Sequence, residues 1–144
     1  MTSTTPSRPA AVSNRLSLRA YDHVMSNIDI PGIPDVAWRP LSADDAEAMS
    51  TLQQACFVED GGYRITATEV REEFDRFGDD AATCSIGAFA PDGRLRAFGW
   101  AQVPESGVTE HRGFVWMEVD PSYRGMVEDG LLAWVEEAGV RRLQ

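Results

Sequence analysis

The chain has 144 residues, of which 43% are hydrophobic and 25% charged, a composition typical of one globular domain rather than of a disordered chain. With 23 acidic against 13 basic residues, its formal net charge is −10. This charge repels phosphate backbones and anionic lipid, so it argues against non-specific binding to nucleic acid or to a membrane. No apolar run reaches the roughly 20 residues that a bilayer-spanning helix needs.

Two segments precede the main body of the chain. Residues 1–14 are rich in Ser, Thr, Pro and Ala, which predicts a disordered tail without the apolar core of a secretory signal. In residues 15–35, apolar side chains recur at helical spacing over residues 16–28, so a leader helix is expected there. The Pro/Gly linker of residues 29–34 ends this helix, because two prolines and a glycine cannot continue it.

The chain has two cysteines, Cys56 and Cys84, and their spacing is not that of metal ligands. We expect both to be buried, reduced thiols, as is usual in a cytoplasmic protein. The sequence therefore predicts a cytoplasmic protein without a metal site.

The first half of the proposed domain, which spans residues 36–144, predicts a strand and two helices. A short strand over residues 36–39 is closed by Pro40, and Ser42 with Asp45 is expected to cap the first helix. A loop over residues 58–64 contains two glycines. Thr66 and Glu69 then form a capping box for the second helix, and Gly78 is expected to end it.

The second half changes to the period of strands. Residues 83–90 and 95–103 are expected to pair around the turn Pro91-Asp92-Gly93, because proline presets φ and glycine accepts a positive φ. A polar connection over residues 104–109, a third strand over 113–119 and a helix over 127–142 follow. The order strand, two helices, three strands, helix predicts an α+β fold of mixed layers rather than a doubly wound sheet.

The prediction of the chemistry of this chain rests on residues 115–132. They run from a strand through a loop bounded by Pro121 into the first turn of a helix. The first turn has four backbone N–H groups without helical partners and a partial positive charge, which together make an anion site. A diphosphate-bearing ligand is one natural occupant of such a site.

This stretch resembles the acyl-CoA-binding motif of the GNAT superfamily of N-acyltransferases, V-x-P-x-x-R-G followed by x-G-x-G or x-G-x-A. Val119, Pro121, Arg124 and Gly125 match its first part. The order of elements from residue 36 also resembles that of the family. Short segments such as Trp38-Arg39-Pro40-Leu41 are similar to those of actinobacterial-type members, which often carry two such domains in tandem.

The resemblance implies a GNAT-like fold that transfers an acyl group from acetyl-CoA, or a related acyl-CoA, to an amine on a small molecule or a peptide. Backbone N–H groups of residues 125–130 would hold the pyrophosphate, and residues 117–119 would pair with the pantetheine arm. The implied cofactor-binding residues are Met117, Glu118, Val119, Arg124, Gly125, Met126, Val127, Glu128, Asp129 and Gly130. Catalysis in the family is mostly positioning. The candidates for the group that accepts the amine proton are Glu118, His111 and Glu110.

The sequence departs from the family pattern at two places. Val127 and Asp129 stand where the family has Gly and Gly or Ala. The valine is expected to add bulk where a phosphate would sit, and the acids Asp129 and Glu128 to compete for the same donors. The chain also ends at Gln144, before the family's remaining strands, so the domain is expected to be incomplete at its C-terminus. An open sheet edge would then suit a homo-oligomer or a C-terminal partner domain.

Two other interpretations stay open at this point. One is a non-catalytic, degenerate GNAT-like half-domain with a structural, dimerisation or effector-binding role. The other is an unrelated small α+β binding module, which would show no splayed sheet beside Arg124.

Overall fold

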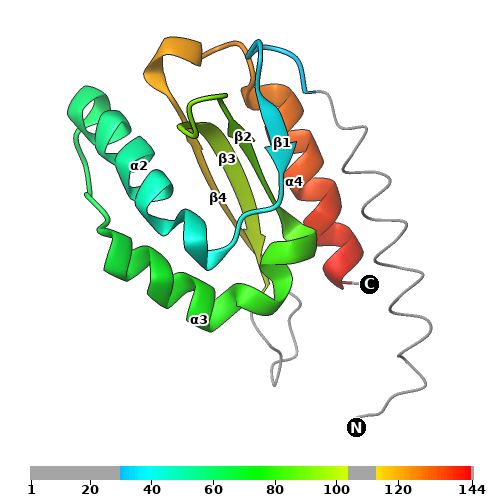
Figure 1. Cartoon of the computed structure of the whole chain (residues 1–144). Helices are drawn as coiled ribbons and strands as arrows, with labels where there is room; N and C mark the ends of the chain where they lie inside the picture. The colour runs from blue at the N-terminus through cyan, green and yellow to red at the C-terminus, as the bar shows by residue number, and fades with distance from the viewer. Residues whose placement is uncertain (1–29, 104–112, 144) are drawn as a thin grey trace, which may run out of the picture.

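The computed structural model of the chain describes residues 30–103 and 113–143. Two short 3₁₀ helices, η1 Ala43–Asp45 and η2 Pro121–Tyr123, accompany the main elements (Figure 1). The main elements are β1 Ala37–Arg39, α2 Ala46–Asp60, α3 Ala67–Cys84, β2 Ser85–Phe89, β3 Leu95–Gln102, β4 Phe114–Val119 and α4 Glu128–Leu143. Their order is the one that the sequence predicts. The expected tail, leader helix and polar connection lie outside the described residues, as do the candidates Glu110 and His111.

The four strands form one antiparallel meander in the order β1-β2-β3-β4. The predicted turn joins β2 to β3: Ala90 N–H donates to the Arg94 carbonyl at 2.8 Å, and Gly93 N–H to the Ala90 carbonyl at 2.9 Å. Gly93 has a φ of +88°, which explains why glycine suits this position. The turn is therefore confirmed, and β3 lies between β2 and β4 in the sheet.

Helices cover both faces of this sheet, α2 and α3 on one face and α4 on the other (Figure 1). Residues alternate along β3 as strand geometry requires. Ala97 and Ala101 pack toward α4, whereas Phe98 and Trp100 pack toward α2 and α3. The mixed α+β architecture expected from the sequence is therefore confirmed, with a hydrophobic core on each side of the sheet.

The α4 helix lies directly on β3 at Gly99. A Cβ atom at Gly99 would be 2.3 Å from Val135 Cγ2 and 3.2 Å from Leu131 Cδ1, so only glycine leaves room for this approach. Because α4 is held at this distance, the loop that enters its first turn is also held in place at the end of β4.

Both long helices extend further than the sequence predicts. The α2 helix continues to Asp60 and stops at Gly61, which has a φ of +74°. The prediction that Gly78 ends α3 is wrong, because the helix runs through Gly78 to Cys84 and β2 starts only at Ser85. A glycine inside a helix costs only about 1 kcal/mol relative to alanine, and the following turn buries Ala81 and Cys84.

Residues 30–33, here called the strap, pack against the start of α4. Ile30 and Ile33 are buried in the core on the α4 side of the sheet. Gly32 has a φ of +121°, and a Cβ atom there would lie 2.3 Å from the Met126 carbonyl oxygen. A Cβ atom at Gly130 would lie 3.0 Å from Ile30 Cγ2. The strap therefore touches the backbone of the loop and first turn in the motif.

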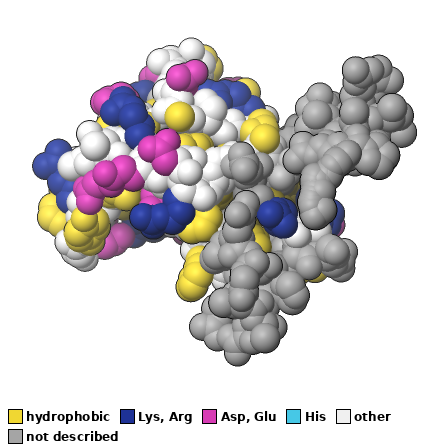
Figure 2. Space-filling view, turned by 90° about the horizontal axis from the view of Figure 1, so that it is seen from below, with side chains coloured by type: hydrophobic (Ala, Val, Ile, Leu, Met, Phe, Trp, Pro, Cys, Tyr) yellow, Lys and Arg dark blue, Asp and Glu magenta, His cyan; other side chains and the backbone are white. Residues whose placement is uncertain are grey.

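Neither a membrane-spanning helix nor a cluster of metal ligands occurs among the described residues. Within residues 30–103 and 113–143, no helix is long and apolar enough to cross a membrane. The same residues contain no group of three or more His, Cys, Asp or Glu side chains that could hold a metal ion. Figure 2 shows acidic and basic side chains next to one another on the face it presents, so the negative charge is not gathered there into a single patch.

Candidate functional site

The loop between β4 and α4 begins with a carboxylate that fixes its shape. Asp120 accepts a hydrogen bond from Ser122 N–H at 2.9 Å and forms an ion pair with Arg96 at 3.2 Å. Burial alone would raise the pKa of Asp120, but the hydrogen bonds from Ser122 and the Arg96 guanidinium lower it on balance. Pro121 then occupies the first position of η2, as suits a residue with no N–H to donate.

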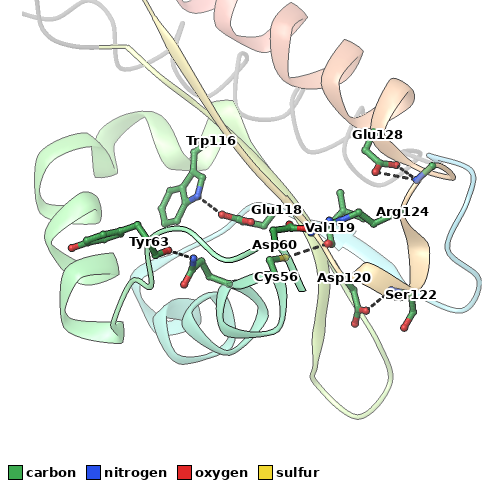
Figure 3. Close-up of polar contacts among 12 residues, drawn as sticks. Cys56, Asp60, Tyr63, Trp116, Glu118, Val119, Asp120, Ser122, Arg124 and Glu128 are labelled. Carbon is green, nitrogen blue, oxygen red and sulfur yellow. Dashed lines mark hydrogen bonds and ion pairs between the residues drawn. The ribbon is translucent and has the colours of Figure 1, made fainter. Parts of the chain in front are cut away.

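The loop turns at Gly125, which has a φ of +82°, and its backbone N–H groups meet the carboxylate of Glu128, the first residue of α4 (Figure 3). Gly125 N lies 2.8 Å from Glu128 Oε1 and 3.0 Å from Oε2, and Val127 N lies 3.3 Å from Oε1. The hydrogen bond from Gly125 N–H is the main cause that lowers the pKa of Glu128. We call the N–H groups of Gly125 and Val127 the nest; it already holds an anionic group.

The expectation that Val127 fills phosphate space is wrong. Its side chain is 1% exposed and packs in the core beside α4, away from the nest. Gly130 leaves room for Ile30 of the strap. Asp129 is exposed in the first turn of α4. Glu128, which lies between the two positions that depart from the motif, is the residue whose side chain contacts the nest.

Arg124, the arginine of the motif, forms a bidentate ion pair with Asp60 at the end of α2. The two N–O distances are 2.8 Å and 2.7 Å, and the hydrogen bonds that the guanidinium donates to Asp60 raise the pKa of Arg124. The same pair lowers the pKa of Asp60. No local pattern predicts this contact, because 64 residues separate the partners.

Glu118, a candidate proton acceptor, lies half-buried on β4 and faces α2 and α3. The Trp116 indole N–H donates to Glu118 Oε2 at 3.1 Å (Figure 3). Trp116 is itself fixed by edge-on packing against Phe98, with ring centroids 5.0 Å apart. The carboxylate is therefore held in one place by an aromatic side chain two residues away on the same strand.

Cys56 joins α2 to the end of β4. Its thiol donates to the Val119 carbonyl at 3.3 Å. Burial is the main cause that raises the pKa of Cys56; Glu118 raises it further and Arg124 opposes them. A thiol with a raised pKa stays protonated at neutral pH and is a poor nucleophile. Cys56 and Cys84 are both buried thiols, as expected.

The structure brings most of the candidate residues to one end of the sheet. Figure 3 shows Glu118, Val119, Arg124 and Glu128 around the junction of β4 and the loop, with Asp60 and Cys56 reaching it from α2. Met117 lies on β4 with its side chain toward the α4 side, opposite to Glu118. Asp60, Cys56 and the strap are contributors that sequence reasoning missed. The spacing of Gly125 and Glu128 was a usable signal, since a carboxylate three residues on commonly reaches back to a backbone N–H.

A surface cleft of about 250 Å³ lies beside this end of the sheet. Ala48, Leu52 and other residues of α2 form one wall, and Asp92 and Arg94 of the β2–β3 turn form the other. The cleft reaches the loop only at Asp120. It therefore adjoins the start of the loop and does not lie over the nest.

Several solved acetyltransferases have the same fold as this chain. A GCN5-related N-acetyltransferase from Sphaerobacter thermophilus matches with a TM-score of 0.62 and 26% identity, over 77% of this chain and 34% of its own. A GNAT superfamily phosphinothricin acetyltransferase from Sinorhizobium meliloti, in complex with AcCoA, matches with a TM-score of 0.57 and 15% identity, over 74% and 60% of the two chains. No protein-family model matches the sequence, and no curated protein matches it.

These likenesses show a GNAT-type fold. The chain spans about a third of the S. thermophilus protein and 60% of the S. meliloti protein. A GCN5-related N-acetyltransferase from Ralstonia eutropha, 24% identical with a TM-score of 0.50, is matched over 74% of this chain and 77% of its own. The expected GNAT-like fold class is therefore confirmed.

Proposed function

We propose that this chain carries the acyl-CoA-binding part of a GNAT-type N-acyltransferase, which transfers an acyl group from acetyl-CoA or a related thioester to an amine. The observation that carries the proposal is the nest at the end of β4. Its N–H groups hold a carboxylate at 2.8–3.3 Å, so their geometry suits an anionic oxygen. Both the fold and the position of the loop after the fourth strand are consistent with this role.

The residues of the loop fit the ligand in three respects. Gly125 lies in an exposed turn and supplies an N–H that already donates to the Glu128 carboxylate. Val127 supplies a second N–H while its own side chain stays in the core. The partial positive charge of the first turn of α4 favours a phosphate at the same place. Acetyl-CoA would supply an acyl group on a thioester, which an amine attacks directly.

Glu118 is our candidate for the group that accepts the amine proton. A neutral amine attacks the thioester carbon, the C–S bond breaks, CoA leaves as a thiolate, and the amine gives up one proton, which finally protonates that thiolate. Glu118 lies on β4 within the proposed site, and the indole of Trp116 fixes the direction of its carboxylate. A fixed carboxylate beside the attacking nitrogen can take this proton, directly or through one water.

Isothermal titration of the purified chain with acetyl-CoA, with CoA alone as a control, tests the binding half of the proposal. Saturable binding of both compounds is expected, because they share the pyrophosphate. Heat changes no larger than those of buffer dilution, up to millimolar acetyl-CoA, both in the wild-type chain and in a Glu128→Ala variant that frees the nest, would refute it.

Substitution of Glu118 tests the catalytic half. With an amine panel and detection of the released CoA thiol, we expect Glu118→Gln to lower kcat by about 100-fold while acetyl-CoA affinity is kept. Glu136→Gln is the matched control, because Glu136 is an exposed acid on α4. Equal kcat in the two variants would remove Glu118 from the proposed mechanism.

A second candidate function is a degenerate GNAT-like domain without catalysis. It is favoured by a specific observation: Arg124 of the loop is already paired with Asp60, and Glu128 at the start of α4 already occupies the nest. Such a domain would serve a structural, dimerisation or effector-binding role. Failure to bind acetyl-CoA, even in variants that free the nest, would favour this second candidate.

A further inference from the structure

We infer that Glu128 is an internal plug of the proposed acyl-CoA site, and that an anionic ligand binds the nest only after this carboxylate swings out. The inference rests on the proposed function and deepens it, since it describes how that same site is controlled. It does not follow from the family motif, because the acid stands between the two positions at which the motif has small residues.

The contacts of Glu128 make it a competitor for the ligand. Both of its carboxylate oxygens accept from Gly125 N–H, at 2.8 Å and 3.0 Å, and Oε1 also lies 3.3 Å from Val127 N. A phosphate oxygen needs the same donors in the same direction. Two anions cannot share these N–H groups, because their charges repel at such a distance. Ligand binding and the Glu128 contact therefore exclude each other.

The plug is free to move while the nest is not. Glu128 is half-buried on the outside of the first turn of α4, so rotation of its side chain can expose the donors. The nest, in contrast, is fixed from behind. Gly32 of the strap lies against the Met126 carbonyl and the Val127 nitrogen, and Val127 is anchored in the core. Only the side chain has to rearrange for a ligand to enter.

The charges around the plug keep it closed at neutral pH. The hydrogen bond from Gly125 N–H, with a smaller contribution from Arg124, lowers the pKa of Glu128, so the carboxylate stays ionised. Arg124 is engaged by Asp60 of α2, and Asp129 is the other acid of the first turn. The strap brings no charged side chain to the loop. An ionised plug accepts strong, charge-assisted hydrogen bonds from the nest.

The plug is tested with two single variants of the full chain, Glu128→Ala and Asp129→Ala. Each removes one negative charge at the same helix terminus, but only the first frees the nest. Affinities for acetyl-CoA and for inorganic pyrophosphate are measured by titration calorimetry. We expect Glu128→Ala to bind acetyl-CoA at least about tenfold more tightly than the wild-type chain, and Asp129→Ala to show a clearly smaller gain.

The Gly125 amide resonance gives a second measurement on the wild-type chain without ligand. Its chemical shift should change as the pH falls through the lowered pKa of Glu128, because protonation weakens the hydrogen bond. Asp129→Ala should keep this titration and Glu128→Ala should lose it. A Gly125 resonance that does not titrate in the wild-type chain would overturn the inference.

The outcomes separate the plug from the proposed function. Equal acetyl-CoA affinity in the wild-type chain and Glu128→Ala, or equal gains in both variants, would overturn the plug and leave the proposed function standing. If Glu128→Ala gains binding of pyrophosphate but binds no acetyl-CoA, the plug stands and the proposed function falls. Binding of neither probe by Glu128→Ala would overturn both.

Discussion

Asp120 shows how one side chain can set the course of the loop that forms the candidate site. It caps η2 through Ser122 N–H and pairs with Arg96 on β3, while its own N–H donates to the Arg96 carbonyl at 2.8 Å. These contacts attach the end of β4 to the neighbouring strand before the chain turns toward Arg124.

We expect Asp120→Ala to lower the free energy of unfolding by about 1–3 kcal/mol, because two charge-assisted hydrogen bonds are lost. Chemical denaturation at neutral pH measures the loss, and Glu136→Ala, at an exposed position of α4, should change stability by less than about 0.5 kcal/mol. The pKa of Asp120 is lowered in the folded chain, so its contribution is complete above the unfolded pKa of about 3.9. The difference between the wild-type chain and Asp120→Ala should therefore shrink as the pH falls through the folded pKa. A difference that grows below pH 4 would contradict this sign.

Two glycines, Gly99 in β3 and Gly78 in α3, have opposite roles in packing. Gly99 lets α4 approach β3, and a Cβ atom there would meet Val135 at 2.3 Å. Gly78 lies inside α3, where an added Cβ atom would meet nothing within 4 Å. The first glycine is required by packing, and the second is a helix residue with unused space beside it.

Alanine substitutions should therefore have opposite signs. We expect Gly99→Ala to destabilise the chain by about 1–3 kcal/mol through overpacking. Gly78→Ala should stabilise it by about 0.5–1 kcal/mol, because alanine loses less backbone entropy in a helix. Thermal unfolding of the two variants, each against the wild-type chain, checks the signs. A destabilised Gly78→Ala variant would mean that α3 does not continue past this residue in solution.

The strap connects the N-terminal side of the chain to the candidate site. Ile30 and Ile33 share the core of α4, and Gly32 touches the backbone of residues 126 and 127. Part of the Pro/Gly linker thus packs with the domain, while the domain boundary at residue 36 stays a prediction.

Gly32→Ala should destabilise the chain by more than about 1 kcal/mol, because its φ of +121° disfavours a side chain and its Cβ atom would meet the Met126 carbonyl at 2.3 Å. Gly62→Ala is the matched control. Gly62 has a φ of +92° but an open surrounding, so the control carries backbone strain without the contact. Denaturation midpoints of both variants measure the difference. Equal losses would show that the strap contact adds nothing to stability.

The order of elements, the turn at Pro91-Asp92-Gly93, the second capping box and the strand-loop-helix motif could all be predicted from the sequence, and the structure agrees with them. These features depend on hydrogen bonds and φ values within a few residues, so neighbouring residues determine them. The helix ends were predicted less well, because burial of Ala81 and Cys84 outweighs the local cost of Gly78.

A glycine turn before a helix start is a local arrangement, so the sequence alone predicts that the loop after β4 can hold an anion. Which distant residues support that loop depends on the tertiary fold. The Asp60–Arg124 pair joins residues that are 64 positions apart, and the contact of the strap with residues 126–130 spans an even longer separation. Contacts of this kind form only because packing on both faces of the sheet brings α2, the strap and α4 to one end of β4, and no local pattern encodes that meeting.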